Sequence, residues 1–190
     1  MRVLVACEFS GVVRDAFAAN GHDAWSCDLL PTERVGKHIK GDVLGILGEG
    51  WDLMVAHPPC TYLAVSGARW WAGRQREQAE ALDFVRALLA APIEKIALEN
   101  PVGRISTAIR KPDQIIQPWQ FGHPEAKTTC LWLKGLSPLI AMYVLPLPVS
   151  GRWQNQTPSG QNNLGPSPTR WRERSRTYAG IAKAMADHWG

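Results

Sequence analysis

The sequence predicts an α/β fold: a doubly wound, mostly parallel sheet of the Rossmann-like type, with helices on both faces. Short apolar segments typical of buried strands alternate with amphipathic helical segments along the first half of the chain. Polar residues follow one strand after another, as they do where parallel strands end at a ligand site. The 190 residues, 45% of them hydrophobic, suffice for one core, so we expect a single domain over 1–190.

The first three strands and the first helix are predicted from short, well-delimited patterns. Residues 2–6, apolar after Arg2, favour a strand, and residues 11–19 gather their apolar side chains on one side of a helix. Asn20-Gly21 ends that helix, because glycine adopts a left-handed conformation easily. Residues 24–27 and 38–40 favour two further strands, each followed closely by an aspartate.

A long helix separates the fourth strand from the fifth. We expect the fourth strand over 51–56, the helix over about 74–90 and the fifth strand over 93–98, with Pro92 in the turn between the last two. Strands that alternate with helices at this spacing are typical of a parallel sheet.

The pattern changes after Pro101. Residues 114–116 and 128–133 favour two more strands, which could form an antiparallel pair at the edge of the sheet. Residues 151–170 have almost no aliphatic side chains, and so little apolar surface cannot offset the entropy of ordering, so we expect a mobile loop. A helical pattern returns over 178–189.

Composition argues against several classes of protein. No apolar segment is long enough to span a membrane and no signal peptide is recognisable, so we expect a cytoplasmic protein without a membrane partner. The four cysteines (Cys7, Cys27, Cys60 and Cys130) are scattered without a CxxC pair, which argues against a zinc or other metal site and favours reduced thiols.

The positive charge is unevenly distributed. The formal net charge is +4, and over 165–190 five basic residues stand against two acidic ones. Such a segment suits contact with phosphate groups, although a solvated arginine face would give the same pattern.

Acidic residues follow three successive strands. Glu8 opens the segment Glu8-Phe9-Ser10-Gly11 at the start of the first helix, where free backbone N–H groups can meet a carboxylate or a phosphate. Asp28 ends the second strand, where an acid commonly accepts hydrogen bonds from ribose hydroxyls. Asp42 follows the third strand and could accept from an adenine amino group. Together these positions predict a site for an adenosine-containing cofactor.

A cysteine and an acid follow the next two strands. Pro58-Pro59-Cys60 forms a stiff turn after the fourth strand, and Glu99-Asn100-Pro101 follows the fifth. Strand ends that are neighbours in the sheet bring such residues together, so the pair suggests a nucleophilic thiol beside an acid. Each residue also has a structural interpretation: Cys60 as a small buried apolar residue, and Glu99 as a cap of a following helix.

The order Phe9-Ser10-Gly11, Pro58-Pro59-Cys60, Glu99-Asn100-Pro101 resembles the DNA cytosine-5 methyltransferase family. The resemblance covers roughly residues 1–135 and the final helix. It is strongest to compact methylase-like proteins of phages and prophages, which implies a phage-encoded protein in a bacterial cytoplasm. Amino-directed methyltransferases resemble one another in an aromatic residue after Pro-Pro, and the cysteine at that position here favours methylation of carbon.

The resemblance implies S-adenosylmethionine as cofactor and DNA as substrate. Cys60 would attack C6 of cytosine as a thiolate, Glu99 would donate a proton or hydrogen bond at N3, and Asn100 would orient the site. The residues that would bind the cofactor are Glu8, Phe9, Ser10, Gly11, Asp28, Asp42 and Pro58.

The chain differs from that family in three respects. Val12-Val13-Arg14 replaces further glycine after Gly11, so we expect a different cofactor turn. No paired arginines follow on a later strand, and no large target-recognition domain precedes the last helix. Recognition would then rest on a partner protein or on the chain's own candidate nucleic-acid contacts. These candidates are Arg74, Arg76, Lys127, Thr129, Arg170, Arg172 and Arg174.

Two other functions remain open at this stage. The missing recognition domain and the basic C-terminal segment would also suit a catalytically silent accessory that binds nucleic acid. Extruding a base from a duplex costs about a few kcal/mol, which a small protein offsets with difficulty. Single-stranded DNA, RNA or a free cytosine nucleotide are therefore alternative substrates.

Overall fold

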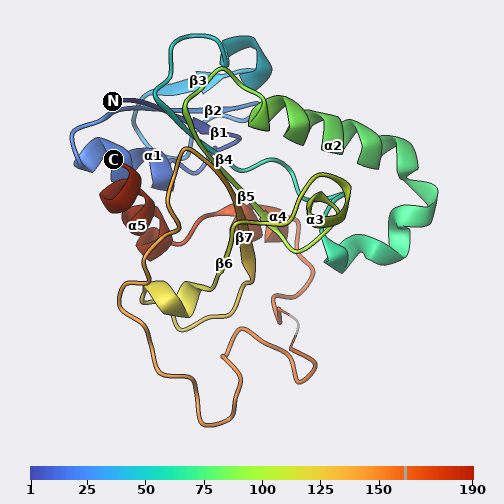
Figure 1. Cartoon of the computed structure of the whole chain (residues 1–190). Coiled ribbons are helices and arrows are strands. Elements are labelled where there is room, and N and C mark those ends of the chain that lie inside the picture. Colours follow the sequence, from blue (N-terminus) through green and yellow to red (C-terminus); the bar gives the residue numbers. More distant parts are fainter. Residues whose placement is uncertain (161) are drawn as a thin grey trace.

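The computed structural model describes residues 1–160 and 162–190, which are built around one seven-stranded sheet (Figure 1). The strands are β1 (Arg2–Ala6), β2 (Asp23–Asp28), β3 (His38–Lys40), β4 (Leu53–Ala56), β5 (Lys95–Pro101), β6 (Gln114–Ile116) and β7 (Thr129–Lys134). The α-helices are α1 (Val12–Ala19), α2 (Gln75–Leu89), α3 (Ile105–Ala108), α4 (Arg170–Ser175) and α5 (Ala179–Trp189). Three 3-10 helices complete the set: η1 (Val43–Ile46), η2 (Val65–Gly73) and η3 (Pro118–Phe121).

The strand order is β3-β2-β1-β4-β5-β7-β6, which confirms the predicted doubly wound α/β fold. The pairs from β3 to β5 are parallel, and β7 runs antiparallel to both β5 and β6. Residues 114–116 and 128–133 were predicted as an antiparallel edge pair; the pairing is confirmed, but β7 lies inside the sheet and only β6 forms the edge. Because β1 and β4 are adjacent, with Ala6 beside Ala56, their carboxyl ends meet.

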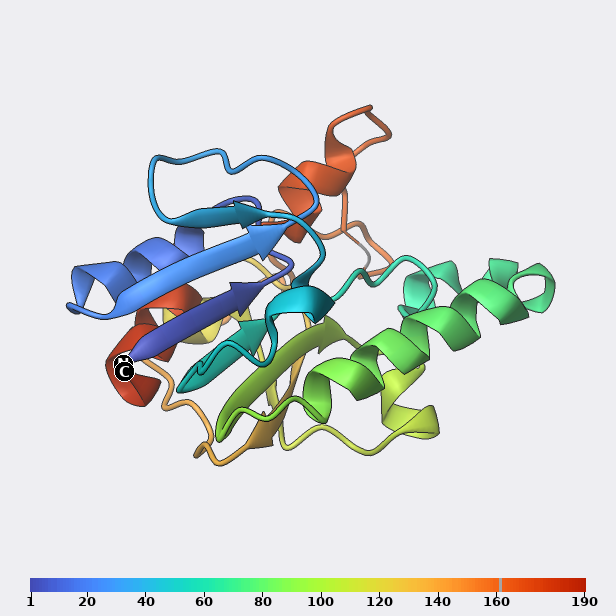
Figure 2. The same cartoon turned by 90° about the horizontal axis from the view of Figure 1, so that it is seen from above.

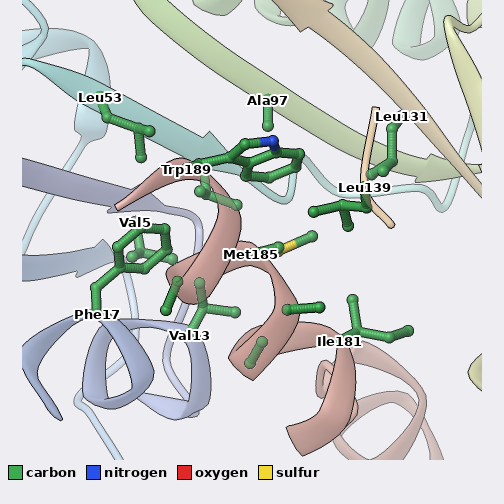
Figure 3. Close-up of a cluster of buried hydrophobic side chains, with 14 of the residues drawn as sticks. Val5, Val13, Phe17, Leu53, Ala97, Leu131, Leu139, Ile181, Met185 and Trp189 are labelled. Carbon is green, nitrogen blue, oxygen red and sulfur yellow. The ribbon is translucent and has the colours of Figure 1, made fainter. Parts of the chain in front are cut away.

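Helices cover both faces of the sheet, as Figure 2 shows. On one face α1 and α5 pack against the sheet, and Phe17, Met185 and Trp189 fill the interface (Figure 3). On the other face α2 turns Leu82 and Val85 toward the strands. Strands covered on both faces are apolar at almost every position, which explains why these segments were recognisable from sequence.

The fifth strand extends beyond the predicted 93–98. Pairing with β7 continues through Asn100 opposite Cys130 and Pro101 opposite Thr129. Glu99 and Asn100 therefore lie within β5, rather than after it, and Glu99 caps no helix. An antiparallel neighbour from a distant part of the sequence holds these polar residues in the sheet, and no local pattern indicates such a neighbour.

Two short helices, η2 and α4, have no buried residues and were not predicted. Residues 151–160 and 162–169 contain no helix or strand, only turns and an isolated bridge between Gln156 and Asn162. Asn155 connects this segment to the body of the protein, since its side-chain amide donates to the carbonyl of Ala126 and its side-chain oxygen accepts from the backbone N–H of Ala126. Its mobility stays a prediction. Within the described parts of the chain, no helix is both long and apolar enough to cross a bilayer.

Candidate active site

The turn after β4 presents Cys60 at the carboxyl edge of the sheet. The backbone N–H of His57 donates to the carbonyl of Ala6 at 2.9 Å, which continues the pairing with β1. Pro58 is buried, and its carbonyl accepts a 2.8 Å hydrogen bond from the side-chain amide of Asn100. Cys60 itself is exposed. A rigid turn anchored to two strands therefore holds an accessible thiol.

Residues after Cys60 fold back into a tight turn. The carbonyl of Cys60 accepts from the backbone N–H groups of Leu63 and Ala64, at 3.0 and 2.8 Å. Gly103 packs so closely against this turn that a Cβ there would lie 2.0 Å from the Leu63 carbonyl oxygen. Glycine at that position therefore lets the segment after β5 pack directly against the backbone of the turn that carries Cys60.

Glu99 lies beside β4 and forms a pair with His57. The Nδ1 atom of His57 is 3.1 Å from Oε2 of Glu99. Burial raises the pKa of Glu99, but the His57 hydrogen bond and the charge of Lys127 outweigh burial, so the pKa lies below its usual value. Glu99 is thus a carboxylate near neutral pH, and Nδ1 of His57 is the donor in this bond.

The charges around Cys60 have opposite effects on the pKa of its thiol. Desolvation by the surrounding protein raises the pKa of the Cys60 thiol, and the Glu99 carboxylate raises it further. Lys127 and Arg174 act in the opposite direction without overcoming these effects. The thiol is therefore mostly protonated near neutral pH.

The pH dependence of Cys60 alkylation tests this electrostatic arrangement. We expect the iodoacetamide reaction to rise with pH to a midpoint above the usual cysteine pKa of about 8.5. Glu99→Gln removes a charge that raises the pKa and should move the midpoint down, whereas Lys127→Gln removes a charge that lowers it and should move the midpoint up. Mass spectrometry of the Cys60 peptide gives the rates. Shifts in the opposite directions would contradict the arrangement.

Glu8 is placed at the predicted cofactor edge, but its carboxylate is already engaged. It accepts hydrogen bonds from the backbone N–H groups of Val13 and Arg14, at 2.7 and 3.1 Å, and from the Ser10 hydroxyl at 3.2 Å. The N–H groups at the start of α1 therefore do meet a carboxylate, but it is the carboxylate of Glu8 itself, which caps this helix from within the chain.

The turn after Gly11 differs from the glycine-rich pattern because of a buried arginine. Arg14 is 1% exposed and bonds Ser26, Thr32 and the carbonyls of Arg34 and Val35. Gly11 has a left-handed φ of 71°, and a Cβ there would lie 2.5 Å from the Arg14 guanidinium. Arg14 thus fixes the loop between β2 and β3.

Asp28 and Asp42 lie at the carboxyl ends of the neighbouring strands β2 and β3, at the same edge of the sheet as Cys7. One oxygen of Asp28 accepts from the backbone of Leu30 at 2.9 Å, and burial raises the pKa of its carboxyl. Asp42 is exposed and accepts from the backbone of Leu44 at 3.0 Å. Cys7 has a φ of 58°, rare for a residue with a Cβ, and such strain is concentrated at functional sites.

A small cavity of about 10 Å³, enough for one water molecule, lies between these strand ends and the C-terminal segment. Its walls are Cys7, Glu8, Phe9, Ser10, His57, Ser175 and Thr177. Phe9 packs against Trp171 at 5.8 Å between ring centroids, and Arg176 forms an ion pair with Glu33 at 2.8 Å. These two contacts hold residues 170–177 across the cavity.

The predicted nucleic-acid contacts are separated by the fold into two groups. Lys127 and Arg174 lie near Cys60, and Nζ of Lys127 donates to the Arg174 carbonyl at 2.8 Å. Thr129 is 4% exposed and donates to the Lys127 carbonyl, so it shapes the segment that carries Lys127. The others have contacts of their own: Arg74 faces Tyr62, Arg76 pairs with Glu80, and Arg170 and Arg172 lie on α4 with Arg174, Arg172 over the ring of Trp171.

His57 is the site residue that the sequence interpretation missed. Its side chain is 8% exposed, and its buried Nε2 has no hydrogen-bond partner among the residues that the structure describes. The ring lies between the small cavity and Glu99. The sequence signal that could have identified His57 is its position, as a titratable residue directly before the Pro-Pro turn.

Comparison with known proteins identifies the fold. No family model and no curated protein matches the chain, whereas fifty chains of solved structures do. One of them is a candidate DNA modification methyltransferase encoded within an E. coli prophage, with 14% sequence identity and a TM-score of 0.50. The two chains therefore share a fold. The match covers 80% of this chain and 53% of that one, so this chain spans about half the length of its structural relative.

Within the described residues, no three His, Cys, Asp or Glu side chains are grouped so that they could hold a metal ion. The three residues with predicted reaction roles, Cys60, Glu99 and Asn100, do lie together, with His57 between them and the cofactor edge. Their roles stay predictions.

Proposed function

We propose that this protein transfers a methyl group from S-adenosylmethionine to C5 of cytosine in DNA, through a covalent adduct on Cys60. The observation that carries the proposal is the convergence of an accessible thiol and the Glu99–His57 pair on the ends of neighbouring strands. The methyltransferase-type fold, and the DNA modification methyltransferase among its structural relatives, support the reaction class and the polymer.

Cys60 activates the ring. C5 of cytosine is a poor nucleophile until C6 becomes saturated, and a thiolate can add to C6 because sulfur is intrinsically nucleophilic. The new S–C6 bond pushes electron density to C5, and N3 takes a proton. Since the thiol is protonated near neutral pH, the reaction needs a base or a rise in pH to generate the thiolate, and Lys127 and Arg174 stabilise that anion.

Glu99 relays the proton that N3 takes. Glu99 is a carboxylate near neutral pH, because its pKa is lowered, and the Cys60 thiol carries a proton, because its pKa is raised. We assign this proton to N3: Glu99 takes it from the thiol as the S–C6 bond forms and passes it on, while the Nδ1–H of His57 holds the carboxylate in place. After methylation the C5 hydrogen leaves as a proton to water, the C6–S bond breaks, and the N3 proton returns through Glu99 to the thiolate.

The cofactor would lie against Phe9, Ser10, Asp28, Asp42 and Pro58. Asp28 and Asp42 are acceptors at the ends of β2 and β3, where a ribose and an adenine amino group need them, and the unpaired Nε2 of His57 borders the same region. These residues therefore fit S-adenosylmethionine, which supplies an electrophilic methyl group when it is bound. The cavity is far smaller than the 300–1,000 Å³ or so of a typical small-molecule site, so Ser175 and Thr177 must move aside on binding.

Analysis of the methylated nucleoside tests the proposal. The protein is incubated with methyl-labelled S-adenosylmethionine and single-stranded or duplex DNA, and the digest is resolved by mass spectrometry. We expect 5-methyldeoxycytidine. An N-methylated nucleoside would contradict the carbon chemistry, and label confined to RNA or to free nucleotides would contradict DNA as the substrate.

A further inference from the structure

A second and larger cavity begins at the residue directly after Cys60. Its volume is about 280 Å³, close to the lower end of small-molecule sites. The lining residues are Thr61, Tyr62, Gly67, Trp70, Trp71 and Arg74, which we call the aromatic pocket. Three aromatic rings around one open cavity are rare on a soluble protein unless they contact a ligand or partner.

Cations lie over each of the three rings. Arg69 stands 4.9 Å from the ring centroid of Trp70, and Arg74 stands 5.5 Å from that of Tyr62. Arg104 stands 5.8 Å from the ring of Trp71. Flat apolar faces interleaved with guanidinium groups form the surface that proteins use to stack nucleobases and neutralise the adjoining phosphates.

Trp70 gives the pocket an open stacking face, since it is 63% exposed. Trp71 is packed more deeply: its Nε1 atom is buried and has no partner among the described residues, although an indole N–H that loses water normally finds an acceptor. The wall of the pocket therefore carries a free stacking face, with an unsatisfied donor on the neighbouring residue.

The position of the pocket relative to Cys60 is fixed. Tyr62 belongs to the turn closed by the Cys60 carbonyl, and its own carbonyl accepts a 2.9 Å hydrogen bond from Gln78 on α2. A base held at Cys60 and a base held in the pocket would lie on adjacent parts of one turn, as neighbouring nucleotides of one strand do.

We propose that the aromatic pocket binds the nucleobase next to the target cytosine, unstacked, on a single strand of DNA. This inference rests on the proposed function, and it names the form of its substrate. A duplex keeps that neighbouring base stacked and paired, so the pocket would favour single-stranded DNA over the same sequence as a duplex.

Binding of oligonucleotides to a Cys60→Ala background tests the pocket apart from the chemistry. The probes are single-stranded DNA with one cytosine, the same strand with an abasic residue 5′ or 3′ of the cytosine, and a strand with a distant abasic residue. We expect Trp70→Ala and the correctly placed adjacent abasic residue each to weaken binding about tenfold, and the two together to cost no more than one alone. Trp70→Phe should retain most of the affinity.

Val65→Ala provides the matched control, because Val65 is an exposed residue of η2 outside the pocket lining. Independent, multiplicative losses from Trp70→Ala and the abasic residue would overturn the inference, as would unchanged affinity in Trp70→Ala or preference for the duplex. If the wild-type protein forms 5-methylcytosine but the losses from Trp70→Ala and the abasic residue are not coupled, the inference about the pocket is refuted and the proposed function stands. Coupled losses without any methylated product support the pocket and refute the proposed function.

Discussion

We expect Cys60→Ala to abolish the proposed methylation of DNA cytosine, with a loss of about 10³-fold or more, because no other group in the proposed site can form the bond to C6. Cys60→Ser is expected to behave in the same way, since a hydroxyl is far less nucleophilic than a thiolate at neutral pH. Radiolabel transfer under single-turnover conditions measures the effect. Because Cys60 is exposed, neither variant should change the thermal unfolding temperature or the affinity for single-stranded DNA.

That pair of controls separates chemistry from folding. A Cys60→Ala protein that keeps its fold and methylates within about tenfold of the wild-type rate would refute the covalent mechanism. Loss of DNA binding together with activity would instead show that the substitution disturbs the turn.

Glu99→Gln lowers the methylation rate by about 10²- to 10⁴-fold, the usual contribution of a general acid. Glutamine can still accept the His57 hydrogen bond and hold the turn, but it cannot pass a proton to N3. The pH profile provides the sharper measurement. In the wild type the rate should fall at high pH as Cys60 and Glu99 lose the one proton that they share, and at low pH as Glu99 becomes protonated and can no longer take it from the thiol.

In Glu99→Gln the decline at high pH should disappear, and the residual rate should instead rise with pH as the Cys60 thiol ionises. Lys127 acts on both the Cys60 thiol and Glu99, so the same profile in Lys127→Gln serves as a control for a change of charge alone. A wild-type profile retained in Glu99→Gln would contradict the assignment of Glu99 as the proton donor.

The core of the fold was predictable because its strands are covered on both faces. The segments that became β1 and β4 are apolar apart from Arg2, and the helix that became α1 ends at the predicted Asn20-Gly21. The segment that became α4 was not predictable as a helix, since its arginine-rich sequence shows no apolar face.

The sequence was enough to predict which residues form the site, but not the contacts between their side chains. Cys60 and Glu99 could be paired because the order of strands in a parallel sheet places β4 beside β5. The His57–Glu99 contact and the engagement of Glu8 by α1 depend on side-chain directions that residue spacing does not define. Lys127 reaches the same region because β7 crosses beside β5, a long-range pairing with no local signal.

Trapping with 5-fluorocytosine tests the central claim most directly. Fluorine at C5 cannot leave as a proton does, so after addition of the thiol and methyl transfer the adduct cannot break down. The account predicts a denaturation-stable, one-to-one complex between the protein and a single-stranded oligonucleotide, dependent on the methyl donor, with the crosslink mapped to Cys60 by mass spectrometry. Absence of a complex from protein that forms 5-methylcytosine, or a crosslink at another residue, would contradict it.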